Sequence, residues 1–138
     1  MTTPDDWNSA TIKEFRENGG KVGGMFEGAT LLLLTTKGAK TGKTRVNPMM
    51  YQLDGDRMYV FASKGGAPTN PDWYHNLVAN PDVTVEVGID SFPVKATVIT
   101  GKERDEIYAK QVSHYPMFAE YQKKVTRKIP VVALTREA

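Results

Sequence analysis

Apolar and polar residues along this chain form short stretches with β periodicity, separated by turn residues. Four leucines stand in a row at Leu31 to Leu34, and further on apolar residues occupy every second position. Strict alternation indicates a half-buried strand, while a short continuous apolar run is consistent with a fully buried one. Asp54-Gly55 is a strong two-residue hairpin signal. Six strands are therefore expected, at residues 30–36, 45–53, 57–62, 83–87, 92–98 and 129–134.

Helical patterns occur at the start, in the middle and near the end of the chain. Trp7, Thr11 and Phe15 recur at four-residue spacing, and Asn18-Gly19-Gly20 supplies the glycines that often end a helix. Asn70-Pro71 has the residue types of a helix N-cap and first helical position. The helices are expected at residues 7–18, 71–79, 103–112 and 116–124.

The order of these elements predicts the fold class. It runs helix, three strands, helix, two strands, one or two helices and a last strand. Hairpins with few crossovers favour an antiparallel sheet closed into a barrel, with helices at its ends, over a doubly wound sheet. The expected class is mainly β (α+β). We expect a single domain over residues 1–138, in which residues 1–20 form an N-terminal helical segment.

Composition and charge remove several classes of function. The chain is 40% hydrophobic and 25% charged, as in ordinary globular proteins, and no apolar run is long enough to span a bilayer. The polar, acidic first six residues do not resemble a signal peptide, so a cytoplasmic location is expected. Without cysteine there is no disulfide or thiolate site, and His75 and His114 lack metal-ligand spacing. A net charge of +2 is too small to indicate a nucleic-acid partner.

The distribution of positive charge is more informative than its total. Four cations and no acid lie within nine consecutive residues: Lys37, Lys40, Lys43 and Arg45. The segment resembles a P-loop, but its two glycines are one residue too close and it runs into Val46-Asn47-Pro48, which opposes a helix. ATP or GTP is therefore not expected. Glycine amides and lysine side chains can still bind another anion, although a solvated hairpin has the same composition.

A second candidate loop, Ser63-Lys64-Gly65-Gly66, follows an expected strand. Consecutive glycines there allow backbone amides to face a planar or anionic ligand, although an ordinary loop is the alternative. If 45–53 and 57–62 form a hairpin, Arg45 and Ala62 lie near the same end, and one ligand can reach both loops. No nucleophile motif or carboxylate pair stands out, which suits a protein that positions a cofactor carrying its own reactivity.

Aromatic residues suggest where an apolar ligand would lie. Tyr115, Phe118 and Tyr121 recur at every third position and would form a stripe on a helix. Such a stripe either packs onto the barrel or covers an apolar substrate. Trp73 is expected to face the core, and Asn76 is a candidate hydrogen-bond partner for a ligand.

Taken in order, these segments resemble the deazaflavin-dependent nitroreductase family, the actinobacterial flavin/deazaflavin oxidoreductases that use coenzyme F420. The resemblance covers nearly the whole chain and implies a split β-barrel of about six antiparallel strands, with an N-terminal helix and two or three further helices. The segments that carry it are Asn18-Gly19-Gly20-Lys21-Val22-Gly23-Gly24, Leu34-Thr35-Thr36-Lys37-Gly38-Ala39-Lys40-Thr41-Gly42, Arg45-Val46-Asn47-Pro48, Ala62-Ser63-Lys64-Gly65-Gly66, Pro71-Asp72-Trp73-Tyr74-His75-Asn76-Leu77, Ala79-Asn80-Pro81, Tyr121-Gln122 and Arg127-Lys128-Ile129-Pro130-Val131-Val132.

The resemblance also implies roles for individual residues. The phosphate and acidic tail of F420 would be held by Lys40, Lys43 and Arg45. Ser63 is expected to contact the ring of the cofactor. It is also the candidate catalytic residue, through a hydrogen bond to the ring or the acceptor. The other residues expected to bind the cofactor are Pro48, Ala62, Lys64, Gly65, Gly66, Trp73 and Asn76. The residues expected to line the acceptor pocket are Met50, Tyr115, Phe118 and Tyr121. Phe118 stands where some members of the family have a tyrosine, and Met50 stands where some relatives have an aromatic residue.

The expected activity is hydride transfer from reduced F420 to a small apolar acceptor such as a quinone, with nitroaromatics as adventitious substrates. A split-barrel reductase that uses FMN and a non-catalytic F420-binding protein are the alternatives. A lipid-soluble quinone leaves peripheral membrane association open. A monomer and a homodimer are both compatible with the sequence.

Overall fold

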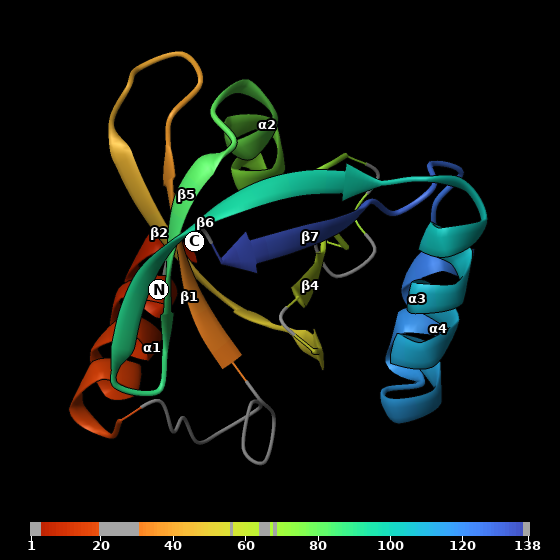
Figure 1. Cartoon of the computed structure of the whole chain (residues 1–138), viewed down its shortest axis with the longest axis horizontal. Coiled ribbons are helices and arrows are strands. Elements are labelled where there is room, and N and C mark those ends of the chain that lie inside the picture. The colour runs from red at the N-terminus through yellow and green to blue at the C-terminus, as the bar shows by residue number, and fades with distance from the viewer. Residues whose placement is uncertain (1–3, 20–30, 56, 64–66, 68, 137–138) are drawn as a thin grey trace.

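A computed structural model describes residues 4–19, 31–55, 57–63, 67 and 69–136, with side chains from residue 9 onward. Figure 1 shows the arrangement of the helices and strands. In chain order these are α1 (Pro4–Glu17), β1 (Leu31–Lys37), β2 (Thr44–Met50), β3 (Gln52–Asp54), β4 (Arg57–Phe61), α2 (Asp72–Ala79), β5 (Asp82–Val87), β6 (Asp90–Ile99), α3 (Gly101–His114), α4 (Met117–Lys123) and β7 (Val131–Arg136).

The strands form one antiparallel sheet in the order β2-β1-β5-β6-β7-β4-β3. β2 and β3 are consecutive pieces of one strand, interrupted at Tyr51, yet they stand at opposite ends of this order. The first piece pairs with β1 and the second with β4, so the interrupted strand closes the sheet on itself. The expected antiparallel barrel of about six strands is confirmed, since two of the seven strands are halves of one.

The barrel is split along β2. In the described ladders β2 pairs with β1 alone, whereas the pairing with β4 begins only at Gln52, opposite Tyr59. Pro48 lies within β2, and proline fits such an edge because it has no N–H to donate to a second neighbour. Among the described strands, one edge of β2 therefore has no ladder partner.

Alternating side chains of β1 build two parts of the core. Leu32 and Leu34 point into the barrel, while Leu31 and Leu33 pack on the other face against Phe15 of α1. All four leucines are buried, which confirms the strand buried on both faces that their uninterrupted run indicates.

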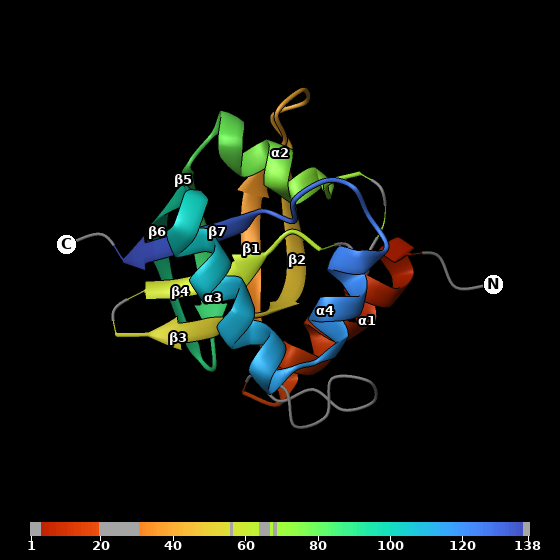
Figure 2. The ribbon, with the colours of Figure 1, turned by 90° about the vertical axis from the view of Figure 1, so that its right-hand side faces the viewer.

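Helices cover the barrel on several sides. Figure 2 shows α2 lying across one end of the curled sheet, where Trp73 and Leu77 join the barrel core. Arg16 fixes α1 to β5 by donating to both carboxylate oxygens of Glu86, at 3.0 and 2.8 Å. Helices α3 and α4 stand together on the far side of the barrel from α1 (Figure 1). No helix in the described ranges has both the length and the apolar character needed to cross a bilayer.

Two local predictions are wrong by one residue. Asp54 pairs with Arg57 as the last residue of β3, so the hairpin turn begins at Gly55, whose φ of 60° suits glycine. Pro71, and not Asn70, is the N-cap of α2. The side chain of Asn70 is unavailable for capping because its Oδ1 accepts a 2.7 Å hydrogen bond from Nη1 of Arg127.

Candidate functional site

A cavity of about 1080 Å³ lies between the turn that joins β1 to β2, the first half of β2, and helices α1 and α2. This volume is slightly larger than the roughly 300–1,000 Å³ that is typical of sites for a small molecule or cofactor. Four of the predicted cofactor-binding residues line it, namely Lys40, Arg45, Trp73 and Asn76. The cavity therefore brings together the basic turn and α2, which are more than 20 residues apart in the sequence.

The backbone of the basic turn is held in a compact loop. Gly38 N donates to Lys43 O at 2.8 Å, and Gly42 N donates to Gly38 O at 2.9 Å. Gly42 has a φ of 72°, a left-handed conformation that glycine adopts without steric cost. The β1–β2 ladder continues up to the pair Lys37 and Thr44, so the turn extends from a rigid hairpin.

Lys40 and Arg45 give the cavity its positive charge. Both side chains are exposed and line the cavity. In the part of the chain that the structure describes, neither forms an ion pair with a carboxylate. Asp72, at the start of α2, is the acid that also lines the cavity. Two unpaired cations on the wall of a cavity favour an anionic ligand.

Asn76 fixes the basic turn to the barrel. Its Oδ1 accepts a 3.0 Å hydrogen bond from the backbone N–H of Ala39, and its Nδ2 donates to Oγ1 of Thr36 at 3.2 Å. Asn76 and Thr36 are both buried. The Asn76 amide, a candidate partner for a ligand, therefore also positions the turn that carries Lys40.

We expect Asn76→Ala to lower the free energy of unfolding by about 2 kcal/mol, because it removes two hydrogen bonds worth about 1 kcal/mol each. Amide exchange at Ala39 should become faster in the same variant. The control is Asn80→Ala at the end of α2, which should change neither quantity by a comparable amount. Unchanged protection of Ala39 would contradict the role of Asn76.

Trp73 and several residues outside the prediction form further parts of the cavity wall. Trp73 is buried, so the ring packs in the barrel core and lines the cavity with its remaining surface. Ser9 and Ile12 of α1 and His75 of α2 also line the cavity. No sequence motif marks Ser9 or Ile12, because their position depends on how α1 packs against β2.

The other predicted cofactor residues are not part of this cavity wall. Lys43 lies in the same turn, and Pro48 lies farther along β2, but neither lines the cavity. Ala62 is fully buried, and Ser63 is half-buried just after β4. The remaining residues predicted for this loop lie outside the described residues: Lys64, Gly65 and Gly66.

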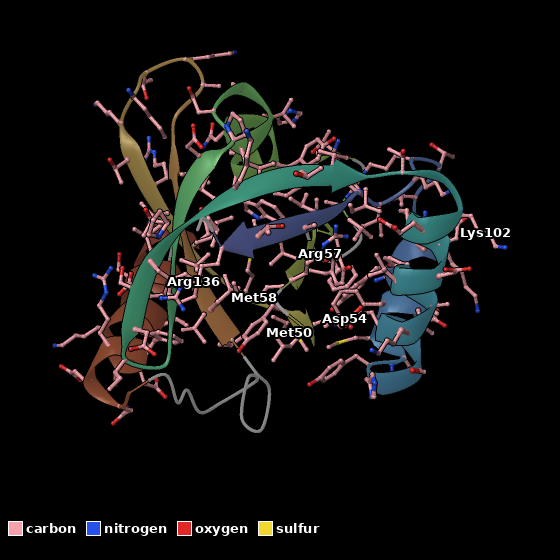
Figure 3. The ribbon with its side chains drawn as sticks, viewed as in Figure 1. Met50, Asp54, Arg57, Met58, Lys102 and Arg136 are labelled. Carbon is pink, nitrogen blue, oxygen red and sulfur yellow. The ribbon has the colours of Figure 1, made fainter. Side chains whose placement is uncertain are left out.

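The predicted acceptor residues gather in an aromatic cluster between the barrel and the α3–α4 pair. Phe118 is 5% exposed, and its ring lies 5.6 Å from that of Phe61 and 5.3 Å from that of Tyr121. Met50 on β2 (labelled in Figure 3), Tyr115 and Tyr121 are partly buried against this cluster. Tyr115 precedes α4, so the three aromatic residues do not form a single helical stripe. Phe118 belongs to the core, whereas Tyr121 keeps part of its surface.

Tyr108 of α3 holds the helix pair together at the centre of this cluster. Its hydroxyl donates to the backbone oxygen of Phe118 at 2.6 Å, and the Arg104 guanidinium lies 4.4 Å from its ring centroid. Burial raises the pKa of Tyr108 to about 12.

This pKa predicts a loss of stability in alkaline solution. The unfolded chain ionises Tyr108 near pH 10, whereas the folded protein keeps it protonated up to about pH 12, so folding is destabilised as pH rises between these values. Between pH 8 and pH 11 the free energy of unfolding should fall by roughly 1 kcal/mol through this one group. Urea denaturation of the wild type and Tyr108→Phe at pH 8 and 11 measures it. An equal pH dependence in both proteins would refute the assignment, and Tyr115→Phe is the control.

The donors and surfaces of the cavity fit a ligand with an anionic part and a planar part. Lys40 and Arg45 supply cationic donors at one end, and Thr41 and Thr44 line the same region. Ile12, Val46 and Trp73 supply apolar surface. A coenzyme with a phosphate and an aromatic ring system has this combination of groups.

Comparison with known proteins agrees with this chemistry. A sequence model of a family described as F420H(2)-dependent quinone reductase matches residues 7–136. An F420H(2)-dependent quinone reductase of Mycobacterium tuberculosis strain H37Rv is 41% identical over 126 residues, which are 88% of this chain and 85% of that protein.

Similar solved structures support both the fold and the family. An F420-H2 dependent reductase, FDR-A, is 42% identical with a TM-score of 0.70, covering 76% of this chain and 93% of its own. A structure described as a domain-swapped dimer is 38% identical with a TM-score of 0.72, covering 96% and 99%. The haem storage protein HutZ of Vibrio cholerae, 15% identical with a TM-score of 0.62 over 95% and 91%, shares the fold alone.

Proposed function

Because this chain belongs to the F420H(2)-dependent quinone reductase family, we propose that its cavity beside the basic turn binds the phosphate and acidic tail of coenzyme F420. The protein is an oxidoreductase, and the bound reduced coenzyme supplies the hydride. The observation that carries the placement is that Lys40 and Arg45 lie on one cavity wall and form no ion pair with any carboxylate among the described residues.

The residues around these cations have different tasks in this proposal. Lys40 and Arg45 bind the anionic part of the coenzyme by charge-assisted hydrogen bonds. Asn76 acts on the coenzyme through the turn, since its amide is already bonded to Thr36 and Ala39. Lys43 is in the turn but not on the cavity wall, so its contribution is long-range and weaker.

The ring of the coenzyme is proposed to lie at the open edge of β2, facing Ser63. Pro48 lies in β2, and Ala62 lies in the chain directly after β4. Trp73 would provide a rigid apolar wall, since it is held in the barrel core. The loop Lys64-Gly65-Gly66 would complete the ring site, as the resemblance implies.

We place the acceptor between the ring and the aromatic cluster. Met50, Tyr115 and Tyr121 retain exposed surface there, while Phe118 supports them from the core. A quinone becomes a quinol by taking up one hydride and one proton, and the Ser63 hydroxyl is proposed to hydrogen-bond the ring or the acceptor oxygen. Nitroaromatics are expected as slower, adventitious acceptors.

Titration of the purified protein with F420, followed by fluorescence, tests the cofactor site. We expect saturable binding at micromolar concentrations, and then oxidation of F420H(2) in the presence of a soluble quinone. No binding at tens of micromolar would contradict the cofactor assignment. Tight F420 binding with no turnover against any quinone or nitro acceptor would identify a non-catalytic carrier, and FMN retained on the purified protein would favour a flavin reductase.

The 38% identical relative was solved as a domain-swapped dimer, and light scattering will decide which state this chain adopts. Sedimentation with lipid vesicles tests the peripheral membrane association that a quinone substrate would favour.

A further inference from the structure

Arg127 lies in the segment between α4 and β7, and its guanidinium is used entirely within the protein. It donates to the backbone oxygens of Ala62 at 3.1 Å, Ser63 at 3.0 Å and Ala67 at 3.0 and 3.2 Å, and to Oδ1 of Asn70 at 2.7 Å. These acceptors lie on both sides of the predicted ring-binding loop. Arg127 is thus neither a cation for the coenzyme phosphate nor a solvated side chain.

The backbone of Arg127 is tied in turn to α4. Nε2 of Gln122 donates to the Arg127 carbonyl oxygen at 2.8 Å, and Oε1 of the same Gln122 accepts from the backbone N–H of Ile129 at 3.0 Å. Gln122 follows Tyr121 directly on α4. The side chain of Arg127 therefore holds the described residues on either side of the predicted ring-binding loop, while its main chain is held next to the proposed acceptor pocket.

Arg104 of α3 makes this connection rigid. Its guanidinium donates to Ile129 O at 2.7 and 3.0 Å and to Oε1 of Gln122 at 2.8 Å, and it lies over the ring of Tyr108. Arg104 is 7% exposed, so these hydrogen bonds are shielded from water. Segment 127–129 is consequently fixed to α3 and α4 on one side and to the ring loop on the other.

We infer that Arg127 is a positioning residue for hydride transfer, which sets the distance between Ser63 on the ring side and Tyr121 on the acceptor side. The inference rests on the proposed function of these two sides. Hydride transfer depends steeply on the separation of donor and acceptor atoms, and a misplacement of about 1 Å can cost roughly a hundredfold in rate. The phosphate site at Lys40 and Arg45 lies outside the Arg127 network, so coenzyme affinity should depend on Arg127 much less than the rate does.

Arginine is required because one planar group must reach four acceptors that point to it from different parts of a loop. Lysine has a single nitrogen on a flexible stem and cannot reproduce this fork. Arg127→Lys therefore keeps the charge and loses most of the geometry, which separates a positioning role from a simple electrostatic one.

The test compares Arg127→Lys and Arg127→Ala with the wild type in stopped-flow oxidation of bound F420H(2) by menadione. We expect the rate of the hydride-transfer step to fall about tenfold in Arg127→Lys and about a hundredfold in Arg127→Ala, with the Kd for F420 changed less than about threefold. Adding guanidinium at millimolar concentration should recover part of the rate in Arg127→Ala. Lys128→Ala is the matched control, because Lys128 is exposed, pairs only with Asp105 among the described carboxylates, and should give the wild-type rate.

Two results would overturn the inference: a wild-type transfer rate in both Arg127 variants, or a Kd for F420 that weakens as much as the rate falls. If Arg127→Ala does not fold, Arg127→Lys and Gln122→Met decide by the same comparison of rate with Kd. A wild-type protein that binds no F420 or reduces no acceptor would instead refute the proposed function, which is a separate outcome.

Discussion

Replacing Lys40 and Arg45 together by alanine is expected to weaken F420 binding by at least about a hundredfold. Each side chain should make one charge-assisted hydrogen bond to the anionic part of the coenzyme, worth about 1.5 kcal/mol at the low end of the usual range. Two such bonds give about 3 kcal/mol, and 1.4 kcal/mol corresponds to a factor of ten. Fluorescence titration of the double variant with F420 measures the change directly.

The matched control removes two exposed lysines that are remote from the cavity, Lys95→Ala with Lys110→Ala. It alters the net charge by the same amount, so it separates local contacts from general attraction between charges. The F420 affinity of Lys43→Ala should lie between those of the two double variants, because Lys43 is in the turn but not on the cavity wall. Equal affinities of the Lys40/Arg45 variant and the wild type would refute the phosphate assignment. Raising the salt concentration should weaken wild-type binding more than binding to the double variant.

Phe118→Ala is expected to lower the free energy of unfolding by about 3 kcal/mol or more. Phe118 is 5% exposed, and three aromatic rings surround it, those of Phe61, Tyr108 and Tyr121. Removing a buried phenyl ring loses its transfer free energy and leaves a cavity, which typically costs 3–5 kcal/mol together. Chemical denaturation monitored by far-UV circular dichroism provides the measurement.

The same variant distinguishes a core residue from a lid over the acceptor. Met117→Ala on the same helix should change stability by only about 0.5 kcal/mol, because Met117 is 42% exposed. Tyr121→Ala should cost less stability than Phe118→Ala and raise the KM for a quinone instead, since Tyr121 is only partly buried. If Phe118→Ala kept wild-type stability and altered only the KM, Phe118 would be part of a lid and not of the core.

Most of the fold could be predicted from local patterns. The leucine run at Leu31 to Leu34 and the alternation over 83–87 and 92–98 correspond to strands, and the expected helices are all present. Errors occurred where a long-range partner changed a local preference. Asn70 is a residue type that favours the N-cap position, but its Oδ1 accepts a hydrogen bond from Arg127, which lies 57 positions later in the chain. Tyr51 interrupts the strand predicted over 45–53. Because of this break, its first part pairs with β1 at one end of the sheet and its second part pairs with β4 at the other end.

The candidate site was predicted in part. Lys40 and Arg45 could be recognised because charge and glycine content are visible in a single turn, and they do line a common cavity. Three other cavity residues could not be recognised from the sequence: Ser9, Ile12 and His75. No local sequence pattern distinguishes a cavity residue from any other surface residue of a helix. Asn76 lines the cavity as well, and its hydrogen bonds to Thr36 and Ala39 add a structural task that the sequence does not reveal. The predicted roles of Pro48, Ala62, Ser63 and the acceptor residues remain predictions.

The β-rich antiparallel class, the basic turn and the family resemblance can be seen in the amino-acid sequence, because periodicity, charge and ordered motifs are properties of neighbouring residues. The folded chain was needed to show that the interrupted strand closes the barrel, that α1 forms a wall of the cavity, and that Arg127 connects Ser63 to α4. These features depend mainly on contacts between residues far apart in the sequence, and the free energy of such contacts comes from packing and buried hydrogen bonds that no local pattern records.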